Sequence, residues 1–328
     1  MPGAKISALG CHVPAGVLTN QDLEKMVDTS NQWILDRTGI SERHIAVPEI
    51  ATSDMAVEAA RIVLAQRGID ATELDAIIVC TVTPDMFFPA TACLVQDRIG
   101  AHGAWGFDLV AACSGFIYGL TTAAHFVMAG THKKVLVIGA DTMSRILDYT
   151  DRSTCILFGD AAGAMLVESC DAGDGFIGFK NEIDGSGGDY LKMPAGGSRM
   201  PATKESIEQR MHFVKQDGGQ VFKYAVRKME ELCTSLLEKH NLTPQDVKLL
   251  IPHQANRRII TSVAERLGMD LEHVIINIDR FGNTTGATIP LATRDAVESG
   301  KLKKGDIVLF AAVGAGLTAG ANLWRWAY

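Results

Sequence analysis

The feature that most constrains this chain is a regular alternation of amphipathic helical segments with short apolar segments. Residues 53–68 begin with a Ser-Asp cap, carry apolar residues at helical spacing and end on a glycine. An apolar strand is expected directly afterwards, at 74–82. The same order continues with a helix at 90–100, a strand at 105–110, a helix at 113–129 and a strand at 133–141. The pattern is typical of an α/β protein with buried, mainly parallel strands.

The second half of the chain repeats this order. A helix at 220–240 followed by an apolar strand corresponds to the helix at 54–67 and the strand after it. Residues 311–326 close the second half much as residues 157–169 close the first. Ordered self-similarity of this kind indicates a repeated unit. We therefore expect two like halves whose strand ends face one another across a shared site, with the boundaries 1–171 and 172–328.

One segment is too long to be an ordinary connection. Residues 184–212 are rich in Gly, Pro and Met. Connections of this length are uncommon in compact domains and are often functional. We expect this segment to cover the shared site.

Composition limits the class of protein. With 328 residues, 47% of them apolar, the chain can bury a substantial core. Its first residues alternate like a strand rather than a signal peptide, and no apolar run approaches the roughly 20 residues that cross a bilayer. We therefore expect a cytoplasmic protein with no membrane partner. The formal net charge of -7 argues against nucleic acid as a partner.

The seven cysteines have no regular spacing and form no Cys-x-x-Cys pair. An odd, irregular set predicts neither a disulfide framework nor a zinc site, so we expect no bound metal. A free cysteine is most often a small, buried, structural residue. That interpretation applies to most of the seven.

Cys113 is the exception, because it lies where an apolar strand gives way to a helix. Its small neighbours Ala111, Ala112, Ser114 and Gly115 leave room for a substrate. A helix N-terminus stabilises a thiolate and lowers the pKa of the thiol. We expect Cys113 to be a nucleophile and the only cysteine that reacts rapidly near neutral pH.

Two further residues follow apolar segments in the second half. His253 ends the strand in LLIPHQANRRI, before a helix that is expected to begin near Ala255. Asn283 lies in the Gly-flanked turn RFGNTTGATIP. Taken singly, the histidine is more often structural and the asparagine more often a turn residue. Together with Cys113 they suggest a catalytic set.

Six motifs in one order resemble those of the β-ketoacyl-acyl carrier protein synthase III family. They are WILDRTGISER, ACSGF, DRSTCILFGDAAGA, PHQAN, GNTTGA and GAGLTAGANLWRW, and they span essentially the whole chain. The resemblance implies the five-layered αβαβα thiolase fold with two pseudo-repeated halves, and a homodimer. It also implies that an acyl-CoA primer is condensed with malonyl-acyl carrier protein to give 3-oxoacyl-carrier protein, which initiates fatty acid biosynthesis.

By this resemblance Cys113, His253 and Asn283 are the catalytic triad. Cys113 holds the primer as a thioester, and the other two side chains stabilise the enolate formed when malonate loses CO2. The backbone N–H groups of Cys113 and Ala315 are implied as the oxyanion hole, Ala315 lying in the Gly314–Gly316 turn. Glycine is more usual in the family at that position. No cofactor is implied, because acyl-CoA and malonyl-carrier protein are substrates.

The resemblance also implies the substrate path. The residues matched to the CoA and pantetheine path are Thr29, Trp33, Arg37, Arg152 and Asn256, with Gly219 where relatives commonly have asparagine. Trp33 and Arg152 would stack on the adenine. Phe88 matches a residue that enters the acyl pocket of the dimer partner, and Phe87 is the neighbouring alternative.

Four basic residues are candidates for binding the acidic carrier protein. They are Lys223, Arg257, Arg258 and Arg266, which would gather at the mouth of the path if the two helices pack as in the family. The alternative interpretation is an ordinary charged helix face.

The same motifs distinguish this activity from related ones. A thiolase would need a second cysteine in the VGAGL turn, and an elongating synthase would need histidine in place of Asn283. A non-catalytic chain-length partner should lack the nucleophile. A related Cys-His-Asn ketosynthase of specialised metabolite or polyketide synthesis, and an acyl thioester hydrolase, remain alternatives. The primer's length and branching are left open, since a methylene changes discrimination by only about 1 to 3 kcal/mol.

Overall fold

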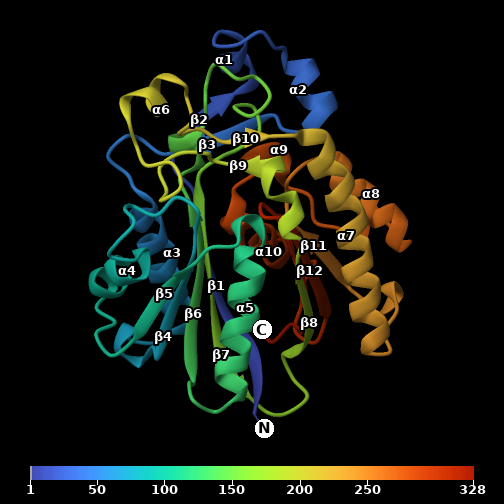
Figure 1. The fold of residues 1–328 in the computed structure, drawn as a ribbon. Helices are drawn as coiled ribbons and strands as arrows, with labels where there is room; N and C mark the ends of the chain where they lie inside the picture. The colour runs from blue at the N-terminus through green and yellow to red at the C-terminus, as the bar shows by residue number, and fades with distance from the viewer. Residues whose placement is uncertain (1) are drawn as a thin grey trace.

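The apolar strands of the first half form a five-stranded sheet in the computed structural model, which describes residues 2–328 (Figure 1). The strand order is β1-β7-β6-β4-β5. Their bounds are β1 Gly3–His12, β4 Ala76–Cys80, β5 Trp105–Leu109, β6 Lys134–Asp141 and β7 Ala161–Cys170. β4 runs parallel to β5 and β6, whereas β7 is antiparallel to both β6 and β1.

The strands of the second half form a four-stranded sheet of the same topology. Its order is β11-β12-β13-β8. The bounds are β8 Phe176–Ile183, β11 Leu249–Pro252, β12 Ile307–Gly314 and β13 Thr318–Arg325. β11 is parallel to β12, and β13 is antiparallel to β12 and β8. β8, β11, β12 and β13 therefore correspond to β1, β4, β6 and β7.

Helices cover both faces of each sheet and produce five layers. The helices are α3 Thr52–Arg67, α4 Thr91–Ile99, α5 Gly115–Met128, α7 Gly218–Lys239, α8 Arg257–Leu267 and α10 Thr288–Glu298. α3 and α4 pack on the outer face of the first sheet, and α7 and α8 on the outer face of the second. α5 and α10 lie between the sheets and share one core with both. This is the αβαβα order that the family resemblance implies.

The central helix α5 is buried on both sides. Residues such as Phe116, Leu120 and Val127 are fully buried, as expected for a helix that is apolar around most of its circumference. A Cβ at Gly119 would come within 2.6 Å of the Cys80 sulfur, so glycine allows α5 to lie directly on the sheet. The tight contact sets the depth at which the start of α5 lies.

The smaller elements surround the ends of the sheets. A hairpin of β2 and β3 carries α1 and α2, and a long segment after β8 carries β9, α6 and β10; α9 precedes α10. The bounds are β2 Gly16–Thr19, α1 Asn20–Glu24, α2 Asn31–Thr38, β3 Glu42–Ile45, β9 Leu191–Lys192, α6 Lys204–Glu208, β10 Lys215–Gln216 and α9 Ile278–Phe281. These elements frame the end of the molecule where Cys113 lies.

Two expectations from the sequence need correction. The sheets are mixed rather than mainly parallel, because β12 turns straight back into β13 without a helical crossover and β7 returns antiparallel to β6. A strand that is covered on both faces is apolar along its length whether it runs parallel or antiparallel to its neighbours, so the sequence pattern does not reveal its direction. α8 begins at Arg257 rather than near Ala255, because the Asn256 side chain caps it. The expected boundary after residue 171 falls in the turn between β7 and β8.

None of the helices within residues 2–328 combines the length and the apolar character needed to cross a membrane.

Candidate active site

Cys113 lies in a tight turn between β5 and the central helix. β5 ends at Leu109, a short 3-10 helix spans Ala112–Ser114, and α5 begins at Gly115. Ala112 has a φ of 48°, in the left-handed region that residues with a side chain seldom adopt. Strained residues of this kind cluster at active sites. The strand, sharp turn and helix are those that the sequence predicts.

Burial determines the protonation state of Cys113. The residue is 6% exposed, and desolvation raises the pKa of its thiol to about 12. The charge of Asp141 acts in the same direction, whereas a hydrogen bond from the Asn283 side chain lowers the pKa. The expectation of a low-pKa thiolate is therefore wrong for the resting protein, because the sequence does not reveal how deeply the turn is buried. The exposed thiol is that of Cys93 instead.

His253 follows β11 and is fixed through its main chain. Its N–H donates to the carbonyl of Ala311 at 2.7 Å, and its own carbonyl accepts from the N–H of Ala255 at 3.0 Å. The residue is 2% exposed, and neither ring nitrogen has a hydrogen-bond partner among residues 2–328. Desolvation lowers the imidazole pKa to about 3. The ring is therefore neutral near pH 7 and can accept a proton at one nitrogen and donate one from the other.

Gln254 holds the loop that carries His253. Its Nε2 donates to the carbonyls of Pro252 at 2.9 Å and Ile275 at 3.0 Å. Its Oε1 accepts from the N–H of Asn277 at 3.0 Å. All of these groups are buried, so the amide fixes the turn on which the histidine is mounted.

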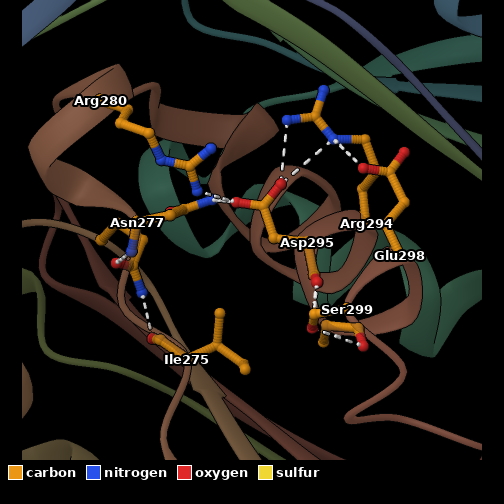
Figure 2. Close-up of polar contacts among 9 residues, drawn as sticks. Ile275, Asn277, Arg280, Arg294, Asp295, Glu298 and Ser299 are labelled. Atoms are coloured by element: carbon orange, nitrogen blue, oxygen red, sulfur yellow. Dashed lines mark hydrogen bonds and ion pairs between the residues drawn. The ribbon is translucent and has the colours of Figure 1, made fainter.

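The polar network continues behind this loop to the second half's surface. Figure 2 shows Asn277 and Asp295 side by side, with the Asn277 amide donating to the Asp295 carboxylate at 2.8 Å. Arg280 and Arg294 lie on either side of that carboxylate, at 2.6 Å and 3.0 Å. The charge of Asp295 is thus balanced, and the network ties α9 and α10 to the histidine loop.

Asn283 lies between α9 and α10 and is held by the first half. Its N–H donates to the carbonyl of Leu157 at 2.9 Å, and its carbonyl accepts from the N–H of Gly159 at 3.0 Å. The side-chain Oδ1 accepts from the N–H of Thr285 at 2.9 Å, which leaves the NH2 group to face Cys113. The turn interpretation and the catalytic one are therefore compatible, because the oxygen serves the turn and the nitrogen remains a donor.

The glycine turn of the second half packs directly on the nucleophile. A Cβ at Gly314 would come within 2.8 Å of the backbone nitrogen of Cys113 and of the carbonyl oxygen of Ala111. Thr318 Oγ1 donates to the same Ala111 carbonyl at 2.9 Å. Ala315, which follows Gly314, is therefore beside Cys113, and the two residues predicted as oxyanion donors come from opposite halves.

Two cavities meet at Cys113. The larger has a volume of about 480 Å³, and Cys113, His253 and Asn283 all lie on its wall. The smaller has a volume of about 150 Å³ and is mostly apolar. Its lining residues are Val82, Ala112, Cys113, Met143, Ile146, Phe158, Leu191, Lys192, Met193, Val214, Thr285 and Ala315. The three predicted catalytic side chains are thus brought to one cavity, with an apolar chamber beside them.

The segment at 184–212 borders both cavities, as the sequence predicts. Leu191 contributes to both walls and Met193 to the smaller one. Arg210 anchors the segment through an ion pair with the buried Asp148, with its Nε 2.6 Å from Oδ2. The apolar cavity is therefore bordered on one side by this segment, which an ion pair and the pairing of β9 with β10 tie to the rest of the fold.

The predicted adenine site is compact. Trp33 and Arg37 of α2 line the larger cavity. The guanidinium carbon of Arg152 lies 5.3 Å from the centre of the Trp33 ring, and that of Arg37 lies at 5.4 Å. Arg152 also donates to the carbonyl of Asp28 at 2.9 Å. Because the Arg152 guanidinium contacts the ring directly, a base can stack between them only after the arginine moves.

The other predicted CoA residues are placed differently. Asn256 lines the larger cavity, although its Oδ1 accepts from the N–H of Arg258 and its Nδ2 donates to the carbonyl of Arg37, both at 2.9 Å. Gly219 also lies on the wall. Thr29 lines neither cavity, and its hydroxyl is buried without a partner in the described part of the chain. The structure therefore brings Asn256 to the path and leaves Thr29 outside it.

The four predicted carrier-protein residues do not form one group. Lys223 and Arg258 line the larger cavity, and Arg257 is exposed beside them at the start of α8. Arg266 lies in the last turn of α8, about 13 Å along the helix from Arg257. It is paired with Glu230 at 2.9 Å. The basic rim consists of the first three residues, because helical spacing carries Arg266 away from the mouth.

Phe87 and Phe88 lie on the surface and line neither cavity. They are 81% and 84% exposed. The loop that carries them is anchored at both ends, since Asp85 accepts from the N–H of Ser53 at 2.9 Å and Asp108 accepts from the N–H of Thr91 at 2.7 Å. Neither ring contributes to the smaller, apolar cavity of its own chain.

Sequence reasoning missed two residues behind the site. Gln254 lies within the PHQAN motif but was not separated from it. Asp141 ends the apolar strand β6 and is fully buried. An acidic residue at the end of an apolar strand was the available signal, since a buried carboxylate needs specific partners.

Comparison with known proteins gives consistent matches. Residues 107–185 match the model for the family 3-oxoacyl-[acyl-carrier-protein (ACP)] synthase III, and residues 237–326 match that for its C-terminal part. The chain is 71% identical to the β-ketoacyl-[acyl-carrier-protein] synthase III of Solibacter usitatus, with 100% of each chain covered. The fold is similar to that of 3-oxoacyl-[acyl-carrier-protein] synthase III from Aquifex aeolicus VF5 (TM-score 0.92, 45% identity, 99% and 100% coverage). It is also similar to the priming β-ketosynthase of the R1128 polyketide pathway (TM-score 0.92, 33% identity, 99% and 96% coverage).

We expect His253 to make the protein less stable in mild acid. Its pKa is about 3 in the folded protein, below the value of 6.5 for a solvated histidine. Between these values the unfolded chain binds the extra proton, so the free energy of unfolding falls as the pH drops below about 6.5. Thermal unfolding followed from about pH 7.5 to about pH 5 should show this fall, and His253→Gln should reduce it. The exposed His102→Gln is the control, and an equal fall in all three proteins would contradict a neutral, buried His253.

Proposed function

The chain belongs to the β-ketoacyl-[acyl-carrier-protein] synthase III family, and on that premise we propose that Cys113, His253 and Asn283 carry out its reaction. Members of the family are acyltransferase-type condensing enzymes of the thiolase fold, and the protein initiates fatty acid synthesis by condensation. Enzymes of the family use acyl-CoA and malonyl-carrier protein. We propose the same two substrates here.

One observation carries the assignment of residues. The thiol of Cys113, the unpartnered ring of His253 and the NH2 group of Asn283 line one cavity of about 480 Å³. Buried polar groups normally have partners, so two unpartnered ring nitrogens beside an amide donor are suited to a polar substrate. A carbonyl or enolate oxygen is an acceptor to which these groups would donate hydrogen bonds.

In the first half-reaction, the Cys113 thiol loses its proton to the neutral His253 ring. The sulfur attacks the thioester carbon of acyl-CoA, and the tetrahedral oxyanion is held by the backbone N–H groups of Cys113 and Ala315. The C–S bond to CoA breaks, the CoA sulfur takes the proton from His253, and the acyl chain remains on Cys113. A base is needed because burial opposes a standing thiolate.

In the second half-reaction, the malonyl thioester loses its carboxylate as CO2. The electron pair of the broken C–C bond enters an enolate, whose oxygen is held by a His253 N–H and the Asn283 NH2 group. The enolate carbon attacks the acyl-Cys113 thioester, and collapse of the adduct expels the Cys113 sulfur. One proton taken up from solvent restores the thiol. Asparagine suits this role, since it donates without titrating.

We expect variants to separate the two half-reactions. Asn283→Ala should load acyl-CoA at a nearly normal rate but lose condensation by about 100- to 1,000-fold, the usual effect of removing one preorganised donor. His253→Ala should lose condensation as strongly and should also load slowly, because the buried thiol then lacks its proton acceptor. The measurements are labelled acyl transfer to the protein and release of labelled CO2 from malonyl-carrier protein.

Cys113→Ala is the control that abolishes loading. If Asn283→Ala releases CO2 at the wild-type rate, its amide is only a turn residue and the triad loses its third member.

The smaller cavity supports a short primer. A dry apolar cavity of about 150 Å³ can hold benzene, and the chamber beside Cys113 has this volume. Its walls, including Phe158 and Val214, are mostly apolar and offer few partners to the ordered water that an acyl thioester hydrolase would need. Intact-mass measurement after exposure to acyl-CoAs of increasing length identifies both nucleophile and primer. A 3-oxoacyl product distinguishes the synthase from the hydrolase.

We propose that the CoA moiety passes through the larger cavity. Trp33 and Arg37 would contact its adenine end once Arg152 moves off the ring, and Asn256 would border the pantetheine. No cofactor or metal is proposed beyond the two substrates, and dialysis against a chelator that abolished activity would contradict this. We also propose that the protein is cytoplasmic and has no membrane or nucleic-acid partner.

We propose that two copies associate through the open edge of the first sheet. β5 is the edge strand, and an unpaired edge is a template for another strand. Exposed apolar side chains cluster along and beside it, with Trp105 at 50%, Val110 at 75%, Phe87 at 81% and Phe88 at 84% exposure. Apolar surface of this kind usually marks an interface. Phe88 would then enter the acyl chamber of the partner.

We expect Phe88→Ala to broaden primer acceptance toward longer chains, because it would remove the ring that closes the partner's chamber. Competition between short and long acyl-CoAs, read as the masses of acyl-Cys113, checks this, and sedimentation analysis checks the dimer. Phe87→Ala is the matched variant on the same loop. Unchanged preference in Phe88→Ala together with a change in Phe87→Ala would move the role to Phe87.

We propose that Lys223, Arg257 and Arg258 attract the acidic carrier protein. Within residues 2–328 none of the three forms an ion pair, and Lys223 and Arg258 lie at the mouth of the larger cavity. Opposite charge at an interface mainly speeds encounter and weakens with salt.

We expect Arg257→Ala to raise the KM for malonyl-carrier protein several-fold at low salt, with little effect on kcat. The removed charge is exposed and steers encounter, so the effect should shrink as salt is added. Arg266→Ala is the control, because that side chain is already paired with Glu230. Equal effects of the two substitutions would show a general charge effect instead of a defined rim.

A further inference from the structure

Asp141 is a buried carboxylate at the end of β6 that the reaction outlined above does not use. It is 0% exposed. Oδ1 accepts from Thr81 Oγ1 at 3.0 Å, from the N–H of Val82 at 2.8 Å and from Thr83 Oγ1 at 3.0 Å. Oδ2 accepts from the N–H of Gly286 at 3.0 Å. A carboxylate with four donors and no cation is a specific arrangement, because burying a charge is costly unless it is fully hydrogen-bonded.

These four bonds join the two halves of the molecule. Three donors follow β4 in the first half, whereas Gly286 belongs to the turn between Asn283 and α10 in the second. The turn is also pressed against β6, since a Cβ at Gly139 would lie 2.1 Å from the carbonyl oxygen of Gly286. Asp141 is therefore the side chain that anchors this turn to the first sheet.

The anchored turn orients the Asn283 amide. Thr285, the residue before Gly286, has a φ of 50°, and its N–H donates to the Asn283 Oδ1 at 2.9 Å. A strained residue persists only when its surroundings hold it. The bond from Gly286 to Asp141 supplies that constraint one residue away, so the carboxylate acts on the donor NH2 group through two linked hydrogen bonds.

The charge of Asp141 also acts on the nucleophile. It raises the pKa of the Cys113 thiol, second only to burial. The other ionisable group it acts on is the buried thiol of Cys80. None of the described lysine, arginine or histidine side chains is ion-paired with it. Burial raises the pKa of the carboxyl itself to about 6, and its four donors act in the opposite direction.

We propose that Asp141 is a positioning residue: through its bond to Gly286 it holds the Asn283 amide in place for the enolate. The proposal rests on the condensation mechanism given above. Because the Asp141 charge also disfavours the Cys113 thiolate, removing it should change two reactions of one variant in opposite directions, which general loss of structure would not produce.

The test uses Asp141→Asn in the full-length protein. Release of CO2 from malonyl-carrier protein by the acyl-loaded enzyme should fall about 10- to 100-fold, as expected for a displaced donor. Alkylation of Cys113 by iodoacetamide should instead become faster at a given pH, about tenfold for each unit by which the thiol pKa falls. The buried Cys233 should stay unlabelled in the same sample, which reports that the fold is intact.

Asp160→Asn is the matched control. Asp160 is as buried as Asp141 and accepts from Ser144 and Ala46, but it is not among the charges that act on Cys113. It should leave the pH dependence of Cys113 alkylation unchanged. A shift as large as that of Asp141→Asn would overturn the electrostatic role.

The wild-type protein provides a second measurement that needs no variant. Protonation of Asp141 near pH 6 weakens its bond to Gly286, so CO2 release by the loaded enzyme should fall about tenfold from pH 7.5 to pH 5. A flat profile, or unaltered CO2 release in Asp141→Asn, would overturn the proposal. Failure of the wild-type protein to condense at all would instead refute the proposed function, and the two results are distinct.

Discussion

The active site depends on the close approach of backbone turns from the two halves of the chain. A Cβ at Gly314 would lie 2.8 Å from the nitrogen of Cys113, and one at Gly139 would lie 2.1 Å from the carbonyl oxygen of Gly286. A side chain at either position would force the turns apart, because the interior is packed without spare volume. The proposed nucleophile comes from the first half, and the proposed donors His253 and Asn283 come from the second. Neither half therefore contains the whole proposed site, which forms only where glycine allows the halves to touch.

Burial at this junction sets the resting protonation states of the proposed catalytic groups. It keeps the Cys113 thiol protonated and the His253 ring neutral, with pKa values of about 12 and about 3. A neutral ring can hold an enolate oxygen without delivering a full positive charge that would quench the carbanion. The same burial makes the ionised form of Asp141 cost stability. Because the pKa of its carboxyl is raised in the folded protein, the free energy of unfolding falls as the pH rises toward 6. Groups that cost stability are commonly retained where function requires them.

The sequence predicted the positions of helices and strands better than the strand directions, ion pairs and pKa values around them. Helical and strand periods located α3, β4 and α7, because burial of one face leaves a period in the chain. Strand direction was not predictable in this way, and the mixed sheets differ from the parallel ones expected. The ion pair that neutralises Arg266 depends on Glu230, which lies on another helix. The high pKa of Cys113 likewise follows from contacts distant in sequence. Periodicity reports which face is buried, whereas these properties depend on which particular groups meet.

The two halves diverge at one sheet edge, and this divergence produces the donor side of the site. In the first half, β5 pairs along its whole length with β4 before turning into Cys113. At the equivalent edge of the second half, the described residues form a single bridge between Leu250 and Val274. The N–H of Asn277 is consequently available to Gln254, which braces the histidine loop. A complete strand would have used such groups for its ladder. Among the described residues the second sheet thus lacks a strand equivalent to β5, and the groups at this edge hold the His253 loop instead.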